Sequence, residues 1–401
     1  MKRSIIIIFF SFFFHGILFS QTQNLIKGIV TSAINGLPLS NCSVFINSTS
    51  KGTITNTHGE FILHNLPEGK YELIVSSIGY QTYSFEYDSK QLPLELKISL
   101  KQKSTELSEV TVEPTLKNGW RDWGKTFVEN FIGTTENASS CSIKNIKVLR
   151  FWFSKKKNRL TVRADEPLII ENKALGYIIK YQLEDFYIDF ITNITFYAGY
   201  PFFQEIDTSS RKIHHWKEER KNVFFGSLKH FIECLYDNKI VAQGFLIVRT
   251  KKILDTEKQR VKNIYSQLMP AADTFAVVNG QMVRINKNVV LPADSIAYYS
   301  NVLKREDYHE QYFSLTADSL VFSDSSAAKF IFFNDRLKVL YKNSAQTEYA
   351  QSEIYLTTPS SVQIAGNGMY YPAKEILVSG YWGRFEKIAN TLPLDYSPDE
   401  K

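Results

Sequence analysis

One segment of the chain carries the residue types and the spacing of a zinc site. It reads His214-His215-Trp216-Lys217-Glu218 and contains H-x-x-E, while His309 could supply a distant third ligand. Cations crowd the same segment and would oppose a divalent metal. They are Arg211, Lys212, Lys217, Arg220 and Lys221. We therefore expect a solvated basic helix here and no metal site.

A second segment, residues 119–126, matches the P-loop expression G-x-x-x-x-G-K-T letter for letter as GWRDWGKT. A phosphate cradle needs a buried strand before it and small residues within it. Here a polar stretch precedes the motif, and two tryptophans lie inside it. Trp120, Trp123, Phe127 and Phe131 fall at i, i+3, i+7 and i+11, which is the apolar stripe of an amphipathic helix. We predict a helix and no nucleotide site.

Other catalytic signatures are weak. The sequence contains neither G-x-S-x-G nor H-E-x-x-H, and Gly366-x-Gly368 lacks a third glycine, so we expect a hairpin turn there. A glycosidase carboxylate pair stays open, because its separation is a three-dimensional property. Candidates are Glu184, Asp185, Asp189, Glu205 and Asp207. Aromatic residues near Pro201 could stack on sugar rings, although a core or interface role is commoner; they are Tyr197, Tyr200, Phe202 and Phe203. We predict no catalytic, cofactor-binding or metal site.

The three cysteines have no metal-binding spacing. Cys42 shares its alternation phase with Val44 and Ile46, so we expect it to point into a core. Cys141 and Cys234 could form one disulfide in an oxidising compartment. A zinc site built on cysteines is not supported.

Composition indicates a mainly β protein of more than one domain. The chain has 401 residues, more than a typical single domain, and 14% of them are aromatic, which favours strands. Its formal charge is +6, with acidic residues interspersed throughout. This charge balance does not indicate a nucleic-acid partner.

The first 20 residues have the pattern of a cleaved signal peptide. Met1-Lys2-Arg3 is followed by an apolar run that is too short to span a bilayer of about 30 Å. No cysteine stands at the expected cleavage point, so a lipid anchor is not expected. No later stretch predicts a transmembrane helix. We expect export and a periplasmic or cell-envelope location.

Residues 21–100 predict a small all-β sandwich. Short alternating runs at residues 25–31, 42–47, 60–64, 71–76, 83–87 and 94–100 are separated by turn signals rich in Gly, Pro and Asn. In the run at residues 71–76, Tyr71, Leu73 and Val75 should be buried, with Ile74 on the other face. Gly59 is the natural residue for a positive φ in the turn before residue 60. His58 and His64 should be solvated.

Several short motifs in this region resemble the carboxypeptidase-like regulatory domain. They are Gly28-x-Val30, Gly36-x-Pro38-Leu39, Val44, Thr55-Asn56-x-x-Gly59-x-Phe61, Leu66-Pro67-x-Gly69-x-Tyr71 and Gly79-Tyr80. The resemblance implies a transthyretin-like (prealbumin-like) seven-stranded β-sandwich, also grouped with carbohydrate-binding-like folds, that is a non-catalytic accessory module. In metallocarboxypeptidases this domain follows the catalytic domain, whereas here it comes first, as is common in Gram-negative envelope proteins.

Residues 101–118 predict a polar linker that contains one strand-like run, residues 107–112. That run resembles the segment found after such sandwiches in TonB-dependent outer-membrane receptors. A receptor barrel of about 22 strands would need more residues than remain. We therefore do not expect a receptor, although an accessory of an outer-membrane transport assembly, docking through this run, remains an alternative.

Residues 119–401 predict a larger, β-rich α+β domain. Strands are expected at residues 143–153, 159–163, 177–186, 362–365 and 376–382, and helices at residues 227–236 and 257–268. Asn279-Gly280 and Asn334-Asp335 are hairpin signals. His230 is expected on the polar side of its helix. Phrases such as Gly226-Ser227-x-x-His230 and Gly380-Tyr381-Trp382 resemble uncharacterised envelope proteins, with no established activity.

The sequence thus favours a non-catalytic exported envelope protein whose sandwich binds or docks a protein or a carbohydrate. The alternatives are an envelope or polysaccharide hydrolase and the transport accessory named above. No cofactor is expected.

Overall fold

The computed structural model describes residues 24–103, 114–207, 210–268, 275–278, 281–284, 293–334, 336–342 and 349–398. The expected signal peptide and the strand-like run at residues 107–112 lie outside the described residues. The chain divides into two compact units, residues 1–112 and residues 113–401. We describe each unit by itself.

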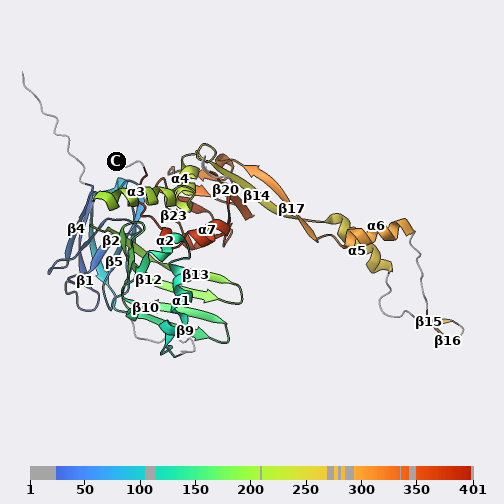
Figure 1. Cartoon of the computed structure of the whole chain (residues 1–401), viewed down its shortest axis with the longest axis horizontal. Coiled ribbons are helices and arrows are strands. Elements are labelled where there is room, and N and C mark those ends of the chain that lie inside the picture. The colour runs from blue at the N-terminus through green and yellow to red at the C-terminus, as the bar shows by residue number, and fades with distance from the viewer. Residues whose placement is uncertain are drawn as a thin grey trace, which may run out of the picture. The chain divides into compact units, whose positions relative to one another are not determined.

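Unit 1 is a β-sandwich of two sheets with the strand orders β4-β1-β7 and β3-β2-β5-β6 (Figure 1). The predicted mainly β fold with an N-terminal seven-stranded sandwich is confirmed. Its strands are β1 Leu25–Ser32, β2 Ser43–Ile46, β3 Gly52–Ile54, β4 Glu60–His64, β5 Lys70–Ser76, β6 Tyr83–Asp88 and β7 Leu94–Leu100. The strand β3 lies where the sequence predicts none.

Local residue choices explain this sandwich. Cys42 is fully buried, as predicted. Gly59 has φ +73°, and a Cβ there would lie 2.5 Å from the carbonyl oxygen of Val30. Ile74 is also fully buried, so the prediction that it faces outward is wrong. His58 and His64 are exposed.

Unit 2 begins with a mixed layer of helix and sheet. The first sheet has the order β8-β11-β12-β10-β9, and β13 also pairs with β12. Its strands are β8 Cys141–Ile143, β9 Leu149–Ser154, β10 Arg159–Ala164, β11 Leu168–Asn172, β12 Tyr177–Asp189 and β13 Ile194–Glu205. Helices in this part are α1 Gly119–Phe131, α2 Glu136–Ser139 and α3 Ser210–Phe224, with the 3-10 turn η2 Ile146–Val148.

The predicted helix over residues 119–131 is confirmed as α1. Phe127 and Phe131 are fully buried in the core beneath the first sheet, and Trp120 and Trp123 pack against that core. The P-loop match is therefore the apolar face of a helix. By contrast, the single strand expected at residues 143–153 is wrong, because η2 separates β8 from β9.

The second half of unit 2 contains a five-stranded sheet, β17-β14-β20-β21-β24, and a four-stranded sheet, β18-β19-β22-β23. The strands of the five-stranded sheet are β14 Phe245–Leu254, β17 Tyr308–Leu315, β20 Arg336–Tyr341, β21 Ala350–Leu356 and β24 Ile376–Ser379. The others are β18 Val321–Ser323, β19 Lys329–Ile331, β22 Val362–Ile364 and β23 Tyr370–Tyr371. Further elements are α4 Leu228–Tyr236, α7 Gly380–Phe385, η3 Ala317–Ser319, η4 Ala373–Glu375 and η5 Ile388–Asn390.

Two predictions fail in this half. The Asn334-Asp335 signal does not join a hairpin, because β19 pairs with β18 and β22 whereas β20 pairs with β14 and β21; Asp335 itself lies outside the described residues. The strand expected at residues 376–382 ends at Ser379, and α7 begins at Gly380. The predicted turn at Gly366-x-Gly368 is confirmed between β22 and β23.

An insertion separates the paired strands β14 and β17. It contains α5 Thr256–Leu268, the hairpin β15 Phe275–Val278 and β16 Gln281–Arg284, and α6 Ala293–Leu303. The predicted hairpin is confirmed by the pairing of Val278 with Gln281. In Figure 1, α5 and α6 lie together beyond the ends of β14 and β17.

The C-terminal segment of unit 2 joins its two hydrophobic cores. Trp382 lies in the core formed with α4 and the five-stranded sheet, whereas Ile388 and Ala389 lie in the core formed with α1 and the first sheet. Asn172 donates its side-chain N–H to the Ala389 carbonyl at 2.9 Å. No helix in the described part of the chain is long and apolar enough to cross a membrane.

Candidate functional site

The structure does not assemble the zinc ligands that the sequence suggests. His214, His215 and Glu218 are exposed on α3, and His309 is exposed on the separate strand β17. Within the described ranges, no group of three His, Cys, Asp or Glu residues could hold a metal ion.

Part of the basic α3 segment is structural. The Arg220 side chain is buried, donates to the Leu175 carbonyl at 2.8 Å and pairs with Glu205 at 2.6 Å. Its guanidinium also lies 3.9 Å from the centre of the Tyr177 ring. These contacts attach α3 to the first sheet, so Arg220 and Glu205 serve the fold.

Asp189 and two of the candidate aromatic residues of this sheet have structural partners. Asp189 pairs with Arg159 at 2.9 Å, and this hydrogen bond lowers the pKa of Asp189 to about 2. Phe203 is fully buried, and Tyr197 packs against the same core. Tyr200 and Phe202 are half-buried on β13. The commoner core role suggested for these aromatic residues therefore holds for Phe203 and Tyr197.

The three cysteines are free. Cys141 packs against the first core and Cys234 lies in the second, so the structure does not pair them. Burial raises the pKa of each of these two thiols to about 12. Neither thiol has the lowered pKa of a reactive cysteine.

A buried polar junction explains two of the short motifs. His230 is only 4% exposed, so its predicted place on the polar side of α4 is wrong. Its Nδ1 accepts a hydrogen bond from the Gly226 N–H at 3.2 Å, and four aromatic rings surround it. They are Phe224, Phe225, Phe245 and Tyr341. Burial among these rings lowers the pKa of His230 to about 4.

The segment around α7 completes this junction. Trp382 donates its indole N–H to the Gly226 carbonyl at 2.8 Å, and the Leu228 N–H donates to Oε1 of Glu386 at 2.8 Å. Glu386 thus caps the first turn of α4. Burial nevertheless raises the pKa of Glu386 to about 7, although the Leu228 hydrogen bond opposes the shift. The junction fixes α4 against α7, which is a structural role.

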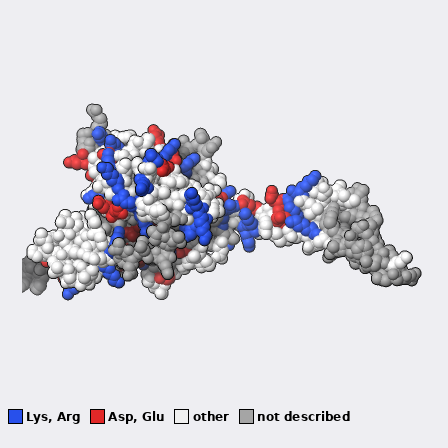
Figure 2. Space-filling model, turned by 90° about the horizontal axis from the view of Figure 1, so that it is seen from below, with Lys and Arg blue, Asp and Glu red and all other residues white. Residues whose placement is uncertain are grey.

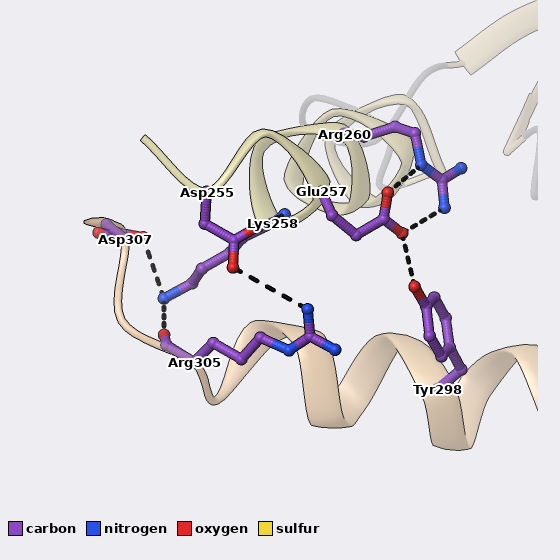
Figure 3. A network of polar contacts seen from close by, with 7 residues as sticks. All are labelled: Asp255, Glu257, Lys258, Arg260, Tyr298, Arg305 and Asp307. Atoms are coloured by element: carbon purple, nitrogen blue, oxygen red, sulfur yellow. Dashed lines mark hydrogen bonds and ion pairs between the residues drawn. The ribbon is translucent and has the colours of Figure 1, made fainter. Parts of the chain in front are cut away.

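Charged residues hold the two helices of the insertion together (Figure 3). Lys258 on α5 contacts the Arg305 carbonyl and pairs with Asp307 at 2.9 Å, and Lys262 pairs with Asp307 at 2.6 Å. The Tyr298 hydroxyl on α6 donates to Glu257 at 3.0 Å.

Arg260 also binds Glu257, through two hydrogen bonds, and lowers the pKa of Glu257 to about 2. Each acid in this network is therefore occupied by a cation of the same helix pair. Val261 and Val302, one on each helix, are fully buried. The network is a clamp between α5 and α6 and leaves no acid–base pair poised for catalysis.

Exposed apolar side chains gather at one end of the unit 1 sandwich. Ile34 and Leu37, in the turn after β1, are 69% and 60% exposed, and Ile78, in the turn after β5, is 72% exposed. Each turn is hydrogen-bonded to the chain at or just after the end of β7: the Ala33 N–H donates to the Leu100 carbonyl at 2.9 Å, and the Lys103 N–H donates to the Gly79 carbonyl at 2.8 Å. We call Ile34, Leu37 and Ile78 the apolar end of unit 1.

An open recess of about 450 Å³, called the cavity below, lies on the outer face of the five-stranded sheet in unit 2. It is lined by Thr250, Lys251, Lys252, Arg336 and Tyr355. Thr250 pairs with Arg336 on β20 and with Tyr312 on β17, and directly paired residues share one face of a sheet. The opposite face carries core residues such as Ile247, Leu337 and Val339.

Hydrogen bonds fix the polar side chains around this cavity. Arg336 pairs with Glu310 and lies 3.6 Å from Glu353. The Tyr355 hydroxyl donates to Glu353 at 2.6 Å, and the Tyr312 hydroxyl donates to Glu310 at 2.9 Å. The Tyr312 hydrogen bond is the largest cause that lowers the pKa of Glu310. These contacts hold Arg336 and Tyr355 in place.

Thr250 is the exception in this ordered group. It is 3% exposed, and its hydroxyl has no hydrogen-bond partner within the described structure. Lys251 and Lys252 are exposed. The sequence did not point to this site, because its members come from three strands and carry no motif. On the side of the molecule that Figure 2 shows, Lys and Arg side chains are interspersed with Asp and Glu side chains.

Residues 26–112 match the family model of the CarboxypepD_reg-like domain. Unit 1 contains this domain. The match confirms the resemblance seen in the short motifs and does not extend to unit 2.

No curated protein matches the chain. Among solved structures, a crystal structure from Bacteroides fragilis NCTC 9343, described as that of a membrane-associated protein of unknown function, is 12% identical. The alignment covers 89% of this chain and 98% of the other, with a TM-score of 0.17. That score is too low to support an argument about fold or function.

Proposed function

We propose that this chain is a non-catalytic exported protein of the cell envelope whose CarboxypepD_reg-like domain docks a partner protein. The apolar end of unit 1 carries the proposal. Three branched aliphatic side chains, each 60% to 72% exposed, lie in the two turns that are hydrogen-bonded to the chain at or just after the end of β7. Burying such side chains stabilises a complex by about 1.5–3 kcal/mol each.

The composition of the apolar end favours a protein over a carbohydrate. Ile34, Leu37 and Ile78 present aliphatic surface, whereas sugar rings stack on aromatic faces. The catalytic alternatives have weaker support: the carboxylates Asp189 and Glu205 are engaged by arginines, and His230 is enclosed among aromatic rings.

Site-specific photocrosslinking in the producing cells tests this function. A crosslinking amino acid at position 34 or 78 should give one shared partner protein, and the product should fractionate with the envelope. Position 62 is the control, because Ile62 is 51% exposed on β4, away from both turns. Equal crosslinking at positions 34, 78 and 62 would contradict docking through the apolar end. A protein that stays in the cytoplasm with residues 1–20 intact would contradict export.

A further inference from the structure

Two hairpin turns of the first sheet in unit 2 lie side by side. Residues 155–158 join β9 to β10, and residues 190–193 join β12 to β13. The start of β10 pairs with the end of β12, so both turns leave the same end of the sheet. The Phe190 N–H also donates directly to the Asn158 carbonyl at 3.0 Å. The two turns therefore form one continuous surface, which we call the double-hairpin tip.

Aromatic rings and hydrogen bonds support the double-hairpin tip. The rings of Trp123, Phe153 and Phe190 contact one another, with centroids 5.0 to 6.2 Å apart. A side-chain oxygen of Asp189 accepts the Ile191 N–H at 3.0 Å. The second turn is thus fixed against the sheet, and it presents Ile191 at the outer surface.

The double-hairpin tip carries an unbalanced positive charge. Lys155, Lys156 and Lys157 are exposed, and no ion pair joins any of them to a carboxylate in the described part of the chain. The two turns contain no acidic residue. The charged residues that flank them, Arg159 and Asp189, pair with each other at 2.9 Å. Three cations are therefore left without a counter-charge.

The helix α1, which packs against β9, does not neutralise these lysines. Its four charged residues balance one another in two pairs. Arg121 pairs with Asp122 at 2.9 Å, and Lys125 pairs with Glu129 at 3.8 Å. The positive charge of the tip is therefore available to a negatively charged partner.

Exposed aliphatic side chains lie beside the lysines. Ile191, in the second turn, is 69% exposed, and Ile194, at the start of β13, is 41% exposed. Projecting turns do not enclose a small ligand, whereas an extended surface can contact both turns at once. At a bilayer surface, lysines attract anionic headgroups, and aliphatic side chains enter the boundary between headgroups and acyl chains. This combination favours a membrane over a soluble anion.

We propose that the double-hairpin tip binds the surface of an anionic phospholipid bilayer, with Lys155, Lys156 and Lys157 at the headgroups and Ile191 inserted among them. The contact is peripheral and belongs to unit 2 alone. It does not depend on the docking of a protein at the apolar end of unit 1, so either proposal can fail without the other.

Co-sedimentation of residues 21–401 with lipid vesicles tests this surface. Residues 1–20 are left out because their apolar run would bind lipid by itself. Vesicles of phosphatidylcholine and phosphatidylglycerol in equal amounts are compared with vesicles of phosphatidylcholine alone. We expect the protein to bind the anionic vesicles about tenfold or more tightly, and high salt should remove most of the difference. A short single-stranded DNA serves as a soluble polyanion and should bind more weakly than the anionic vesicles.

A triple variant tests the lysines. Lys155→Gln, Lys156→Gln and Lys157→Gln together should weaken binding to anionic vesicles by about a hundredfold, because each lysine near the surface contributes about fivefold. The matched control makes the same change at three exposed lysines elsewhere in unit 2 and should bind like the wild type. These are Lys180, Lys212 and Lys217.

A single variant tests the aliphatic contact. Ile191→Ser should weaken binding to anionic vesicles by about tenfold or more. Its control is Val241→Ser, because Val241 is 74% exposed in the turn before β14. All of these side chains are exposed, so each variant should unfold in urea as the wild type does.

Three results would overturn the proposal: the anionic vesicles bind the protein no better than phosphatidylcholine vesicles do, DNA binds as tightly as the anionic vesicles, or the variants of the double-hairpin tip bind like their controls.

Discussion

Replacing Glu386 by Gln should remove part of the pH dependence of the stability of unit 2. Glutamine keeps an oxygen to accept the Leu228 N–H and cannot titrate. In the wild type, burial raises the pKa of Glu386 from 4.5 to about 7. The folded state therefore holds this proton more tightly than the unfolded state.

The raised pKa of Glu386 sets both the sign and the size of the change in the free energy of unfolding with pH. The stability associated with protonated Glu386 is complete below pH 4.5 and is lost as the pH rises through about 7. The full shift corresponds to about 3 kcal/mol, of which roughly 2–3 kcal/mol falls between pH 5 and pH 8. Over that interval, the free energy of unfolding of the wild type should fall by this amount relative to Glu386→Gln. Tyr197, Tyr370 and Tyr381, whose pKa values are raised, stay protonated throughout.

Urea unfolding followed by tryptophan fluorescence measures this difference. All five tryptophans lie in unit 2, so the signal reports that unit alone. Comparing the two proteins at each pH cancels the titration of every other group, His230 included. Parallel stability curves from pH 5 to pH 8 would show that Glu386 has an ordinary pKa, and the argument from burial would fail.

Three further predictions concern other parts of the fold. His230→Asn keeps an acceptor for the Gly226 N–H. Because the pKa of His230 is lowered to about 4, the free energy of unfolding of the wild type should fall by up to about 3 kcal/mol as the pH falls from 6.5 to 4. The variant should not show this loss in the same urea assay. Gly59→Ala should destabilise unit 1 by about 3 kcal/mol. Gly36 also has a positive φ, but an added Cβ would meet open space there, so Gly36→Ala should cost only about 1 kcal/mol. Hydrogen exchange of the β1 amides measures both costs, and equal effects would refute the steric argument. Asp307→Asn should weaken the clamp between α5 and α6, seen as roughly fivefold faster amide exchange in α5 and not in α4; high salt should reduce the difference.

Local patterns predicted local structure well. The stripe of Trp120, Trp123, Phe127 and Phe131 specified α1, and Asn279-Gly280 lies between the paired strands β15 and β16. The regulatory-domain motifs specified the sandwich because turn glycines such as Gly59 occupy backbone positions that other residues resist.

The predictions that failed concern segments whose structure depends on residues far away in the sequence. Asn334-Asp335 predicted a hairpin, yet β20 pairs with β14 and β21, whereas β19 pairs with β18 and β22. Gly380, at φ +68°, turns the expected strand into α7, and Trp382 is then buried against Gly226. Thr250, Arg336 and Tyr355 are separated by up to 105 residues in sequence and meet only through strand order, so no spacing rule could have found the cavity.

The placement of residues 388–392 in the first core has a consequence for the order in which the molecule folds. A chain that emerges from its N-terminus can close the unit 1 sandwich once β7 is available to pair with β1. Unit 2 must wait, because the core beneath α1 lacks Ile388 and Ala389, and the α4 core lacks Trp382, until these residues have been synthesised. More than 250 residues, from α1 to α7, therefore remain incompletely packed during synthesis, and unit 2 depends on protection from aggregation over that interval.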